Sequence, residues 1–195
     1  RQLTVLFCDL VGSTELSTRM DPEDLSRLLR VYHDTAGAVI RALDGHVAQY
    51  LGDGLLVYFG YPTAHEDSAA RAVRAARGIL DALAAVNPRV RASFGVEIHA
   101  RIGIHTGVVM VGEVGTEERQ ERLAVGETPN LAARVQGQSP PDAVLVTEAT
   151  WRLVGAAFEG RELGSVALKG ITLPVALYEV TGERGARTHP RPAGA

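Results

Sequence analysis

The sequence is poor in cysteine, lysine and aromatic residues, and it lacks long apolar runs. Cys8 is the single cysteine among 195 residues, which excludes an internal disulfide and is typical of a reducing compartment. A free cysteine in an apolar stretch is expected to be a small buried strand residue. No apolar run approaches the roughly 18 residues needed to span a bilayer, and no secretory signal opens the chain. We therefore expect a cytoplasmic protein with no membrane partner.

The chain also lacks a strong excess of either charge. Its net charge is −3, with 22% charged and 46% hydrophobic residues, so we expect no nucleic acid among its partners. The length suits one domain with a sizeable core. Residues 182–195 are rich in Gly, Arg, Ala and Pro and carry little apolar content. We expect one domain over 1–181, cut from a longer protein, and a linker or disordered tail over 182–195.

Several signatures of nucleotide binding and catalysis are missing as well. There is no G-x-x-x-x-G-K-[ST] loop and no G-x-G-x-x-G fingerprint. The nucleophile elbow G-x-S-x-G is absent, although this does not exclude a Ser/His/Asp triad. Six scattered histidines and one cysteine do not favour a zinc site.

Apolar periodicity predicts strands that alternate with helices. Helical faces cover about 21–43, 65–86 and 129–138, the last capped by Thr128, and a short helix covers 148–154. Asp53-Gly54 is predicted at the tip of a hairpin, and His105-Thr106-Gly107 between two strands. The predicted strands are 3–7, 46–50, 55–61, 96–104, 108–114, 143–147, 166–168 and 175–180. This order predicts an α+β fold, a ferredoxin-like βαββαβ sandwich on an antiparallel sheet.

The stretch Phe7–Thr14 places an acid at the end of the first strand, directly before a turn. Gly12–Thr14 are turn and helix-cap residues, and the N–H groups of a turn that enters a helix attract phosphate. An acid beside such a cradle would repel phosphate unless a divalent cation lay between them. An unpaired ionised acid among apolar neighbours would also be costly to bury. Asp9 is therefore a candidate metal ligand.

Gly52-Asp53-Gly54 offers a second acid for the same cation. Two carboxylates brought together repel unless a cation joins them. Hard carboxylate and phosphate oxygens are the ligands that Mg²⁺ accepts, and two such acids could hold two ions. The alternative is that Asp-Gly is only a favoured turn pair, which needs no function.

Polar candidates also occur in the second half of the chain. Asn130 and Arg134 are four residues apart and project from one helix face. They form either an exposed polar face or a group that orients a reacting atom and neutralises charge on phosphate. Lys169 is the only lysine among 20 basic residues. It is there by chance, or it supplies a compact point charge to phosphate.

Four motifs, in order and at suitable spacing, resemble the catalytic domain of class III nucleotidyl cyclases over about Gln2–Thr181. They are Phe7–Thr14, Leu51–Gly54, Gly103–Gly107 and Val125–Arg134. The chain resembles in particular the bacterial members that lie N-terminal to an ATPase and helical-repeat region. The resemblance therefore implies fusion to a C-terminal regulatory region.

The resemblance implies an adenylate cyclase, in which the ribose 3′-oxygen of ATP attacks the α-phosphorus to give 3′,5′-cyclic AMP and pyrophosphate. It implies that Asp9, Asp53 and the Leu10 carbonyl bind two divalent cations per site, Mg²⁺ or Mn²⁺. It also implies that Asn130 positions the ribose and that Arg134 stabilises the transition state. The triphosphate would be held by the backbone N–H groups of Val11, Gly12, Ser13 and Thr14 and by Lys169 and Arg119.

In this family the metal acids come from one protomer and the Asn/Arg pair from the other. The resemblance thus implies a head-to-tail homodimer with shared active sites and an inactive monomer. The residues that read the base depart from the usual pattern, because Gln49 stands where adenylate cyclases carry lysine and Leu123 where they carry an acid or threonine. An amide can serve either purine, and a leucine makes no hydrogen bond. GTP is therefore an alternative substrate to ATP.

Two alternatives to an adenylate cyclase remain open from the sequence. One is a guanylate or mixed-specificity cyclase. The other is a catalytically silent nucleotide-binding or dimerisation module that regulates an attached domain. The four residues Asp9, Asp53, Asn130 and Arg134 argue against a silent module, because such a module has no need of all of them.

Overall fold

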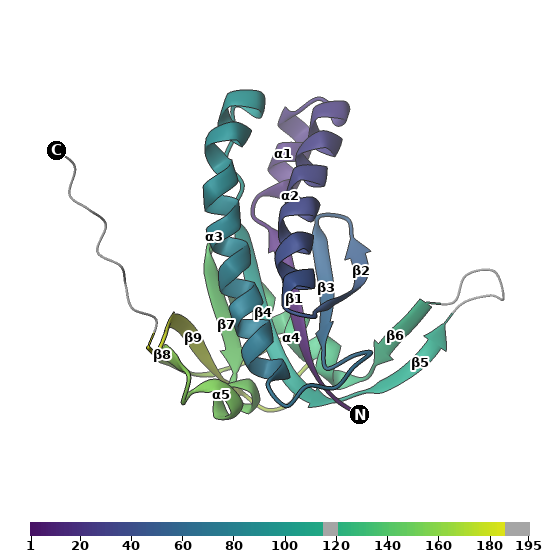
Figure 1. The fold of residues 1–195 in the computed structure, drawn as a ribbon, viewed down its shortest axis with the longest axis vertical. Coiled ribbons are helices and arrows are strands. Elements are labelled where there is room, and N and C mark those ends of the chain that lie inside the picture. The colour runs from purple at the N-terminus through teal and green to yellow at the C-terminus, as the bar shows by residue number, and fades with distance from the viewer. Residues whose placement is uncertain (115–120, 186–195) are drawn as a thin grey trace.

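The chain folds into a central sheet with helices on both faces (Figure 1). A computed structural model describes residues 1–114 and 121–185. The seven strands of the main sheet lie in the order β2-β3-β1-β4-β7-β9-β8, and β5 and β6 form a separate hairpin. The elements are β1 (Gln2–Leu10), α1 (Ser13–Arg19), α2 (Pro22–Ala42), β2 (His46–Leu51), β3 (Gly54–Phe59), α3 (Ser68–Phe94), β4 (Ala100–Val108), β5 (Met110–Val114), β6 (Glu121–Val125), α4 (Glu127–Gln138), β7 (Ala143–Thr147), α5 (Glu148–Val154), β8 (Phe158–Val166) and β9 (Val175–Glu183).

The two faces of the sheet follow from the alternation of side chains along each strand. On β1, Leu6, Cys8 and Leu10 pack into a core with α2 and α3, whereas Leu3 and Val5 belong to a second cluster that includes Ala132 of α4. Helices α2 and α3 lie side by side over the first face, and α4 covers the other (Figure 1). Cys8 is fully buried, so its expected role as a small core residue is confirmed.

The predicted α+β fold is confirmed, and most element positions agree with the sequence analysis. Asp21 caps α2 by accepting a hydrogen bond from the Glu23 N–H (2.9 Å). One strand pair differs from the expected antiparallel sheet: β4 and β7 are parallel, because the chain crosses over through α4 between them. Helix α3 continues past its predicted end with Pro88 inside it, and the prediction of that end was wrong.

The domain boundary predicted at 181/182 stays a prediction. Strand β9 runs to Glu183, and Gly182 pairs with Glu159 of β8. Residues 186–195, most of the predicted tail, lie outside the described residues. In the part of the chain that the structure describes, no helix is both long and apolar enough to cross a membrane.

The expected break at His105-Thr106-Gly107 was wrong, because β4 runs straight through this motif. The glycines make room for a helix rather than for a turn. A Cβ on Gly103 would overlap the Gln136 backbone and lie 2.8 Å from the Ala132 carbonyl oxygen, and one on Gly107 would lie 2.5 Å from the Thr128 hydroxyl. The motif therefore lets α4 lie directly on β4.

Thr128 was also expected in a different role. Helix α4 begins at Glu127 with Gly126 as its N-cap, and no side chain caps it. The Thr128 hydroxyl instead donates a hydrogen bond to the Val108 carbonyl (2.9 Å). Thr128 thus ties the start of α4 to the end of β4, and its prediction as a cap was wrong.

Replacing Gly103 with alanine is expected to destabilise the protein by about 1–3 kcal/mol, because the new methyl group would push α4 away from β4. Gly137→Ala is the control, because Gly137 lies in α4 and its Cβ would meet nothing within 4 Å. This change should be neutral or slightly stabilising. Urea unfolding of both variants measures the difference. Equal stability of the two variants would contradict close packing at Gly103.

Candidate active site

Asp9 and Asp53 are brought together at one end of the sheet. Asp9 lies near the end of β1 and pairs with Gly54, the first residue of β3, so the turn that carries Asp53 lies beside it. Gly52 and Asp53 form the two-residue turn between Leu51 and Gly54. Gly52 has φ +65, as the first central residue of a type II′ turn requires. The hairpin was predicted correctly, but its tip is Gly52-Asp53 rather than Asp53-Gly54.

The carboxyl groups of Asp9 and Asp53 lie in contact, and this contact changes the pKa of Asp9. The pKa of Asp9 is raised from 3.8 to about 6, first by partial burial and then by the contact of its carboxyl group with that of Asp53. The Leu10 N–H, which donates to Asp9 Oδ1 at 3.0 Å, opposes this rise. Asp53 Oδ2 is buried and has no hydrogen-bond partner. The site thus holds a carboxylate oxygen, Asp53 Oδ2, that the protein itself does not satisfy.

This shift predicts how the metal-free protein responds to pH. Because the pKa of Asp9 is higher in the folded state than its ordinary value of 3.8, the folded state loses stability as pH rises from about 4 to about 6. Asparagine does not titrate, so Asp9→Asn lacks this loss. The free energy of unfolding of the variant minus that of the unmodified protein should therefore increase as pH rises over this range. Urea unfolding in EDTA at pH 4, 5, 6 and 7 tests it. A difference independent of pH would contradict the raised pKa.

Arg101 is a site residue that the sequence analysis missed. It lies directly opposite Asp9 in the neighbouring strand β4, so both side chains are on the face that α4 covers. Its Nε is buried and has no hydrogen-bond partner. Its charge lowers the pKa of Asp9, against the larger effects of burial and Asp53. The signal in the sequence was a charged residue between the apolar Ala100 and Ile102, directly before the motif Gly103–Gly107.

The turn that follows β1 agrees only in part with the expected phosphate cradle. The Val11 N–H donates to the His99 carbonyl (2.8 Å) and extends the β1–β4 ladder, so this amide is not free for phosphate and its expected role was wrong. Gly12 has φ +70 and is the N-cap of α1, which starts at Ser13. The first N–H groups of a helix have no acceptor within it. Free amides in this turn therefore begin after Val11.

Asn130 and Arg134 lie on α4 and face away from the sheet. Both are exposed, whereas their neighbours Leu131, Ala132 and Val135 are buried against the strands. The start of α4 contacts Gly107 and Val108 at the far end of β4. Gly107 is six residues along the strand from Arg101. At about 3.3 Å per residue this is roughly 20 Å. One copy of the chain therefore does not bring Asn130 to Asp9.

The remaining expected residues are spread across the sheet. Gln49 pairs with Leu56, so it lies on the same face as Asp9. Lys169 is exposed between β8 and β9, and β4, β7 and β9 separate β8 from the strand of Asp9. Leu123 lies in β6 opposite Gly112, and its side chain is outside the described part of the chain. Arg119 also lies outside the described residues.

Comparison with known proteins settles the family. The sequence matches the family described as "Adenylate and Guanylate cyclase catalytic domain" over residues 1–182. The chain belongs to the class III nucleotidyl cyclases. It is 33% identical over 184 residues to adenylate cyclase 1 of Rhizobium meliloti (strain 1021), covering 93% of this chain but 28% of that protein. The chain thus spans less than a third of that relative's length.

Two solved cyclases have the same fold as this cyclase domain. The adenylyl cyclase CyaB from P. aeruginosa has a TM-score of 0.90 at 29% identity, over 94% of this chain and 95% of that chain. The guanylyl cyclase Cya2 also has a TM-score of 0.90, at 31% identity, over 96% of this chain and 95% of that chain. The two acids of this domain suit the divalent cations that cyclases of this class use.

The donor set of the cyclase domain fits such cations. The described residues contain no group of three or more His, Cys, Asp or Glu side chains that could form an all-protein cage. Two carboxylates with an unsatisfied buried oxygen instead suit Mg²⁺ or Mn²⁺, which complete their coordination with phosphate oxygens and water. Asp9, Asp53 and the nearby Leu10 carbonyl are the groups that would hold them.

Proposed function

We propose that this cyclase domain converts ATP to 3′,5′-cyclic AMP and pyrophosphate at two sites, each shared between two copies of the chain. The observation that carries the proposal is the division of the site residues. The acids Asp9 and Asp53 meet at one end of the sheet, while Asn130 and Arg134 point away from it. A second copy, placed head to tail, would bring its Asn130 and Arg134 to these acids.

Exposed apolar side chains lie beside both halves of the divided site. Tyr50 and Leu51 precede the Gly52-Asp53 turn and are 53% and 43% exposed. Val108 and Met110, next to the start of α4, are 75% and 76% exposed. Large apolar side chains on a surface favour association, so these four residues support a contact between copies.

Each residue then has a defined part in the reaction. Bound at Asp9, Asp53 and the Leu10 carbonyl, two divalent cations, Mg²⁺ or Mn²⁺, would activate the ribose 3′-hydroxyl and neutralise phosphate oxygens. Arg101 adds a positive charge beside Asp9, where the triphosphate lies. The turn amides after Val11 hold phosphate oxygens.

The other copy supplies the groups that complete the site. Its Asn130 fixes the ribose so that the 3′-oxygen lies in line with the α-phosphorus, and its Arg134 neutralises the charge that develops there. Its Lys169 binds the terminal phosphates. This division explains why a single copy is expected to be inactive.

The choice of base is the open part of the substrate assignment. The 33% identity to adenylate cyclase 1 of Rhizobium meliloti supports ATP as the substrate. A guanylate or mixed-specificity cyclase is the second candidate, because the guanylyl cyclase Cya2 is equally similar in fold. Gln49 lies on the active-site face, and its amide can pair with either purine.

Product formation from ATP and from GTP, each with Mg²⁺ and with Mn²⁺, tests the proposal. We expect cyclic AMP, with activity per protomer that rises with protein concentration, because association completes the sites. Comparable cyclic GMP would establish mixed specificity. No cyclic product from the folded protein under any condition would contradict the proposal and favour a silent regulatory module.

A further inference from the structure

Two adjacent residues of α2 reach the two strand ends that carry the metal-binding acids. The Tyr32 hydroxyl is hydrogen-bonded to the Cys8 thiol (3.1 Å), directly next to Asp9 on β1. Tyr32 is fully buried, so this contact fixes the end of β1 on α2. The following residue, His33, lies at the other strand end, beside the β2–β3 hairpin.

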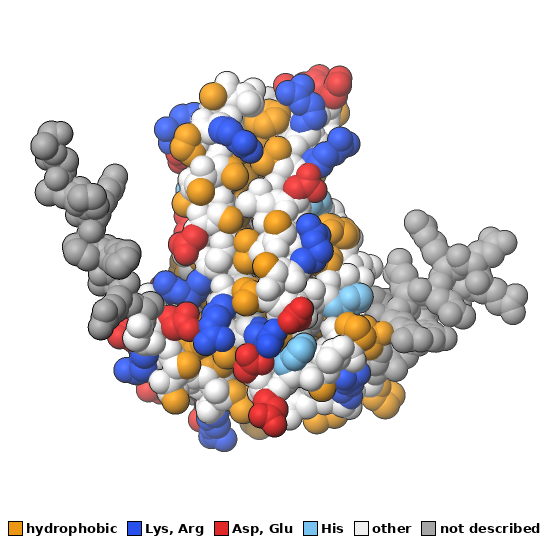
Figure 2. Space-filling view, in the orientation of Figure 1, with side chains coloured by type: hydrophobic (Ala, Val, Ile, Leu, Met, Phe, Trp, Pro, Cys, Tyr) orange, Lys and Arg blue, Asp and Glu red, His pale blue; other side chains and the backbone are white. Residues whose placement is uncertain are grey.

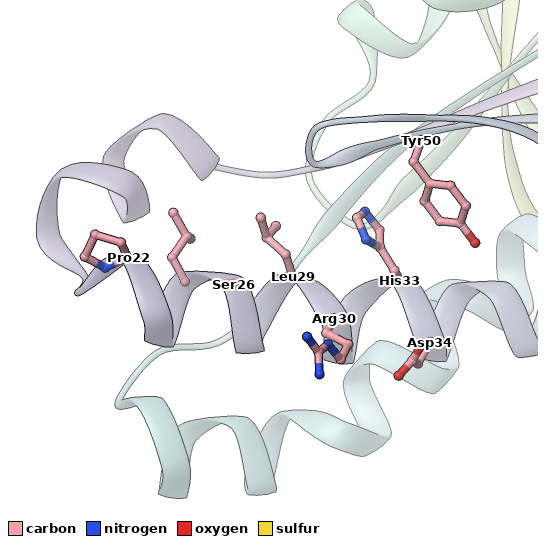
Figure 3. A pocket seen from close by; sticks show the side chains of 8 residues that line it. Pro22, Ser26, Leu29, Arg30, His33, Asp34 and Tyr50 are labelled. Carbon is pink, nitrogen blue, oxygen red and sulfur yellow. The ribbon is translucent and has the colours of Figure 1, made fainter. Parts of the chain in front are cut away.

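His33 packs on the hairpin that carries Asp53. Its ring lies edge-to-face on Tyr50, with ring centroids 5.0 Å apart, and it also contacts the ring of Tyr32. Figure 3 shows His33 on α2 pointing toward the hairpin, next to Tyr50. Burial lowers the pKa of His33, and the nearby charges of Asp34 and Asp53 and the Gly52 carbonyl oppose this shift. The ring therefore faces the turn itself.

The buried polar atoms without partners belong to Asp53 and to residues that interact electrostatically with one of the two acids. Among the residues that the structure describes, three buried side-chain atoms make no hydrogen bond: His33 Nε2, Asp53 Oδ2 and Arg101 Nε. Such atoms are rare in folded proteins and need an explanation. Asp53 and Arg101 belong to the proposed catalytic site. His33 lies against the Gly52-Asp53 turn of the same site, where its ring contacts Tyr50 and interacts with the Gly52 backbone and the Asp53 charge.

We propose that His33 is a positioning residue, which holds the Gly52-Asp53 turn and thereby aims the Asp53 carboxylate at the metal. The inference rests on the proposed function. A polar ring against the turn restricts the backbone that carries Asp53, much as partners of metal ligands orient those ligands elsewhere. The alternative is that the ring of His33 only fills space beside Tyr50.

Two substitutions separate these alternatives. His33→Phe keeps a ring against Tyr50 and removes both nitrogens, whereas His33→Gln removes the ring and keeps a hydrogen-bond donor. If positioning is the role, His33→Phe should weaken Mn²⁺ binding about tenfold or more, and His33→Gln should retain more affinity. If only packing matters, the order of the two variants should be reversed.

The measurements are direct Mn²⁺ binding by electron paramagnetic resonance and the Mn²⁺ concentration that gives half-maximal cyclase activity. The matched control is His46→Phe, because His46 is also half-buried and begins β2 of this hairpin, with its ring against Tyr58 and Tyr61 and no interaction with either acid. It should leave both values unchanged. Thermal unfolding in EDTA verifies that His33→Phe and His46→Phe remain folded.

Each outcome decides the question. Weaker Mn²⁺ binding and a higher half-saturating Mn²⁺ concentration in His33→Phe, with a normal His46→Phe protein, support the positioning role. Values within twofold of the unmodified protein would overturn it while leaving the proposed function intact. If His33→Phe does not fold, His33→Leu replaces it: weaker Mn²⁺ binding in His33→Leu than in His33→Gln supports the role, and equal or stronger binding overturns it. Failure of the unmodified protein to form any cyclic product would instead overturn the proposed function.

Discussion

Replacing Asp53 with asparagine is expected to lower cyclase activity by roughly 10³-fold or more and to leave the fold intact. Asp53 ends a two-residue turn, where asparagine is also accepted, so the hairpin should form normally. The lost carboxylate, however, removes several kcal/mol of charge stabilisation in the transition state. Cyclic nucleotide formation at saturating Mn²⁺ measures the loss.

The same substitution should raise the stability of the metal-free protein. Asp53 raises the pKa of Asp9 through direct contact and repulsion, so its removal relieves two acids held together. We therefore expect a higher melting temperature in EDTA and a smaller increase on adding Mn²⁺. This opposite effect on stability and activity is typical of a site in which function strains the fold.

Asp34→Asn is the control for Asp53→Asn. Asp34 is an exposed acid on α2 near the same hairpin, so the variant loses one negative charge close to the site without touching Asp9. It should retain activity within about twofold, as is usual for an exposed side chain. Activity of Asp53→Asn within tenfold of the unmodified protein would remove Asp53 from the metal site.

Most helices and strands could be predicted from the sequence, because helix caps and apolar periodicity are properties of neighbouring residues. Asp21-Pro22 starts α2, and the apolar face of that helix packs as its periodicity indicates. The edge strand β8 was largely missed, since its residues are mostly exposed and carry little hydrophobic pattern. Gly107 was misinterpreted as part of a break, because only the folded protein reveals the helix that lies against Gly103 and Gly107.

The sequence offered candidate site residues one by one, but their spacing could not show how they are divided in space. From the sequence, Asp9 and Asp53 were expected to lie together because a cation could join two acids, and the structure does place them side by side. Asn130 faces away from them because α4 packs on Gly103 through its other side, which carries Ala132 and Gln136. The buried nitrogens of Arg101 and His33 that lack a hydrogen-bond partner could not be predicted, because their burial results from packing between distant segments of the chain.

Mixing two inactive variants should restore activity if the sites are shared between copies. In an Asp9→Ala dimer each site lacks a metal ligand, and in an Arg134→Ala dimer each site lacks its guanidinium. A hybrid dimer has one site with both defects and one site with neither. Random association makes half of the dimers hybrid, so an equimolar mixture should reach about a quarter of the unmodified activity.

A second mixture makes this test specific. Asp9→Ala and Asp53→Asn both affect the half-site formed by β1 and the β2–β3 turn, so no hybrid of these two has an intact site. That mixture should stay inactive, although its proteins exchange subunits equally well. If only the first mixture regains activity, Asp9 and Arg134 must act from different copies. Without rescue in the first mixture, after exchange has been verified, each copy would have to bring its own Arg134 to Asp9, against the outward orientation of Arg134 on α4.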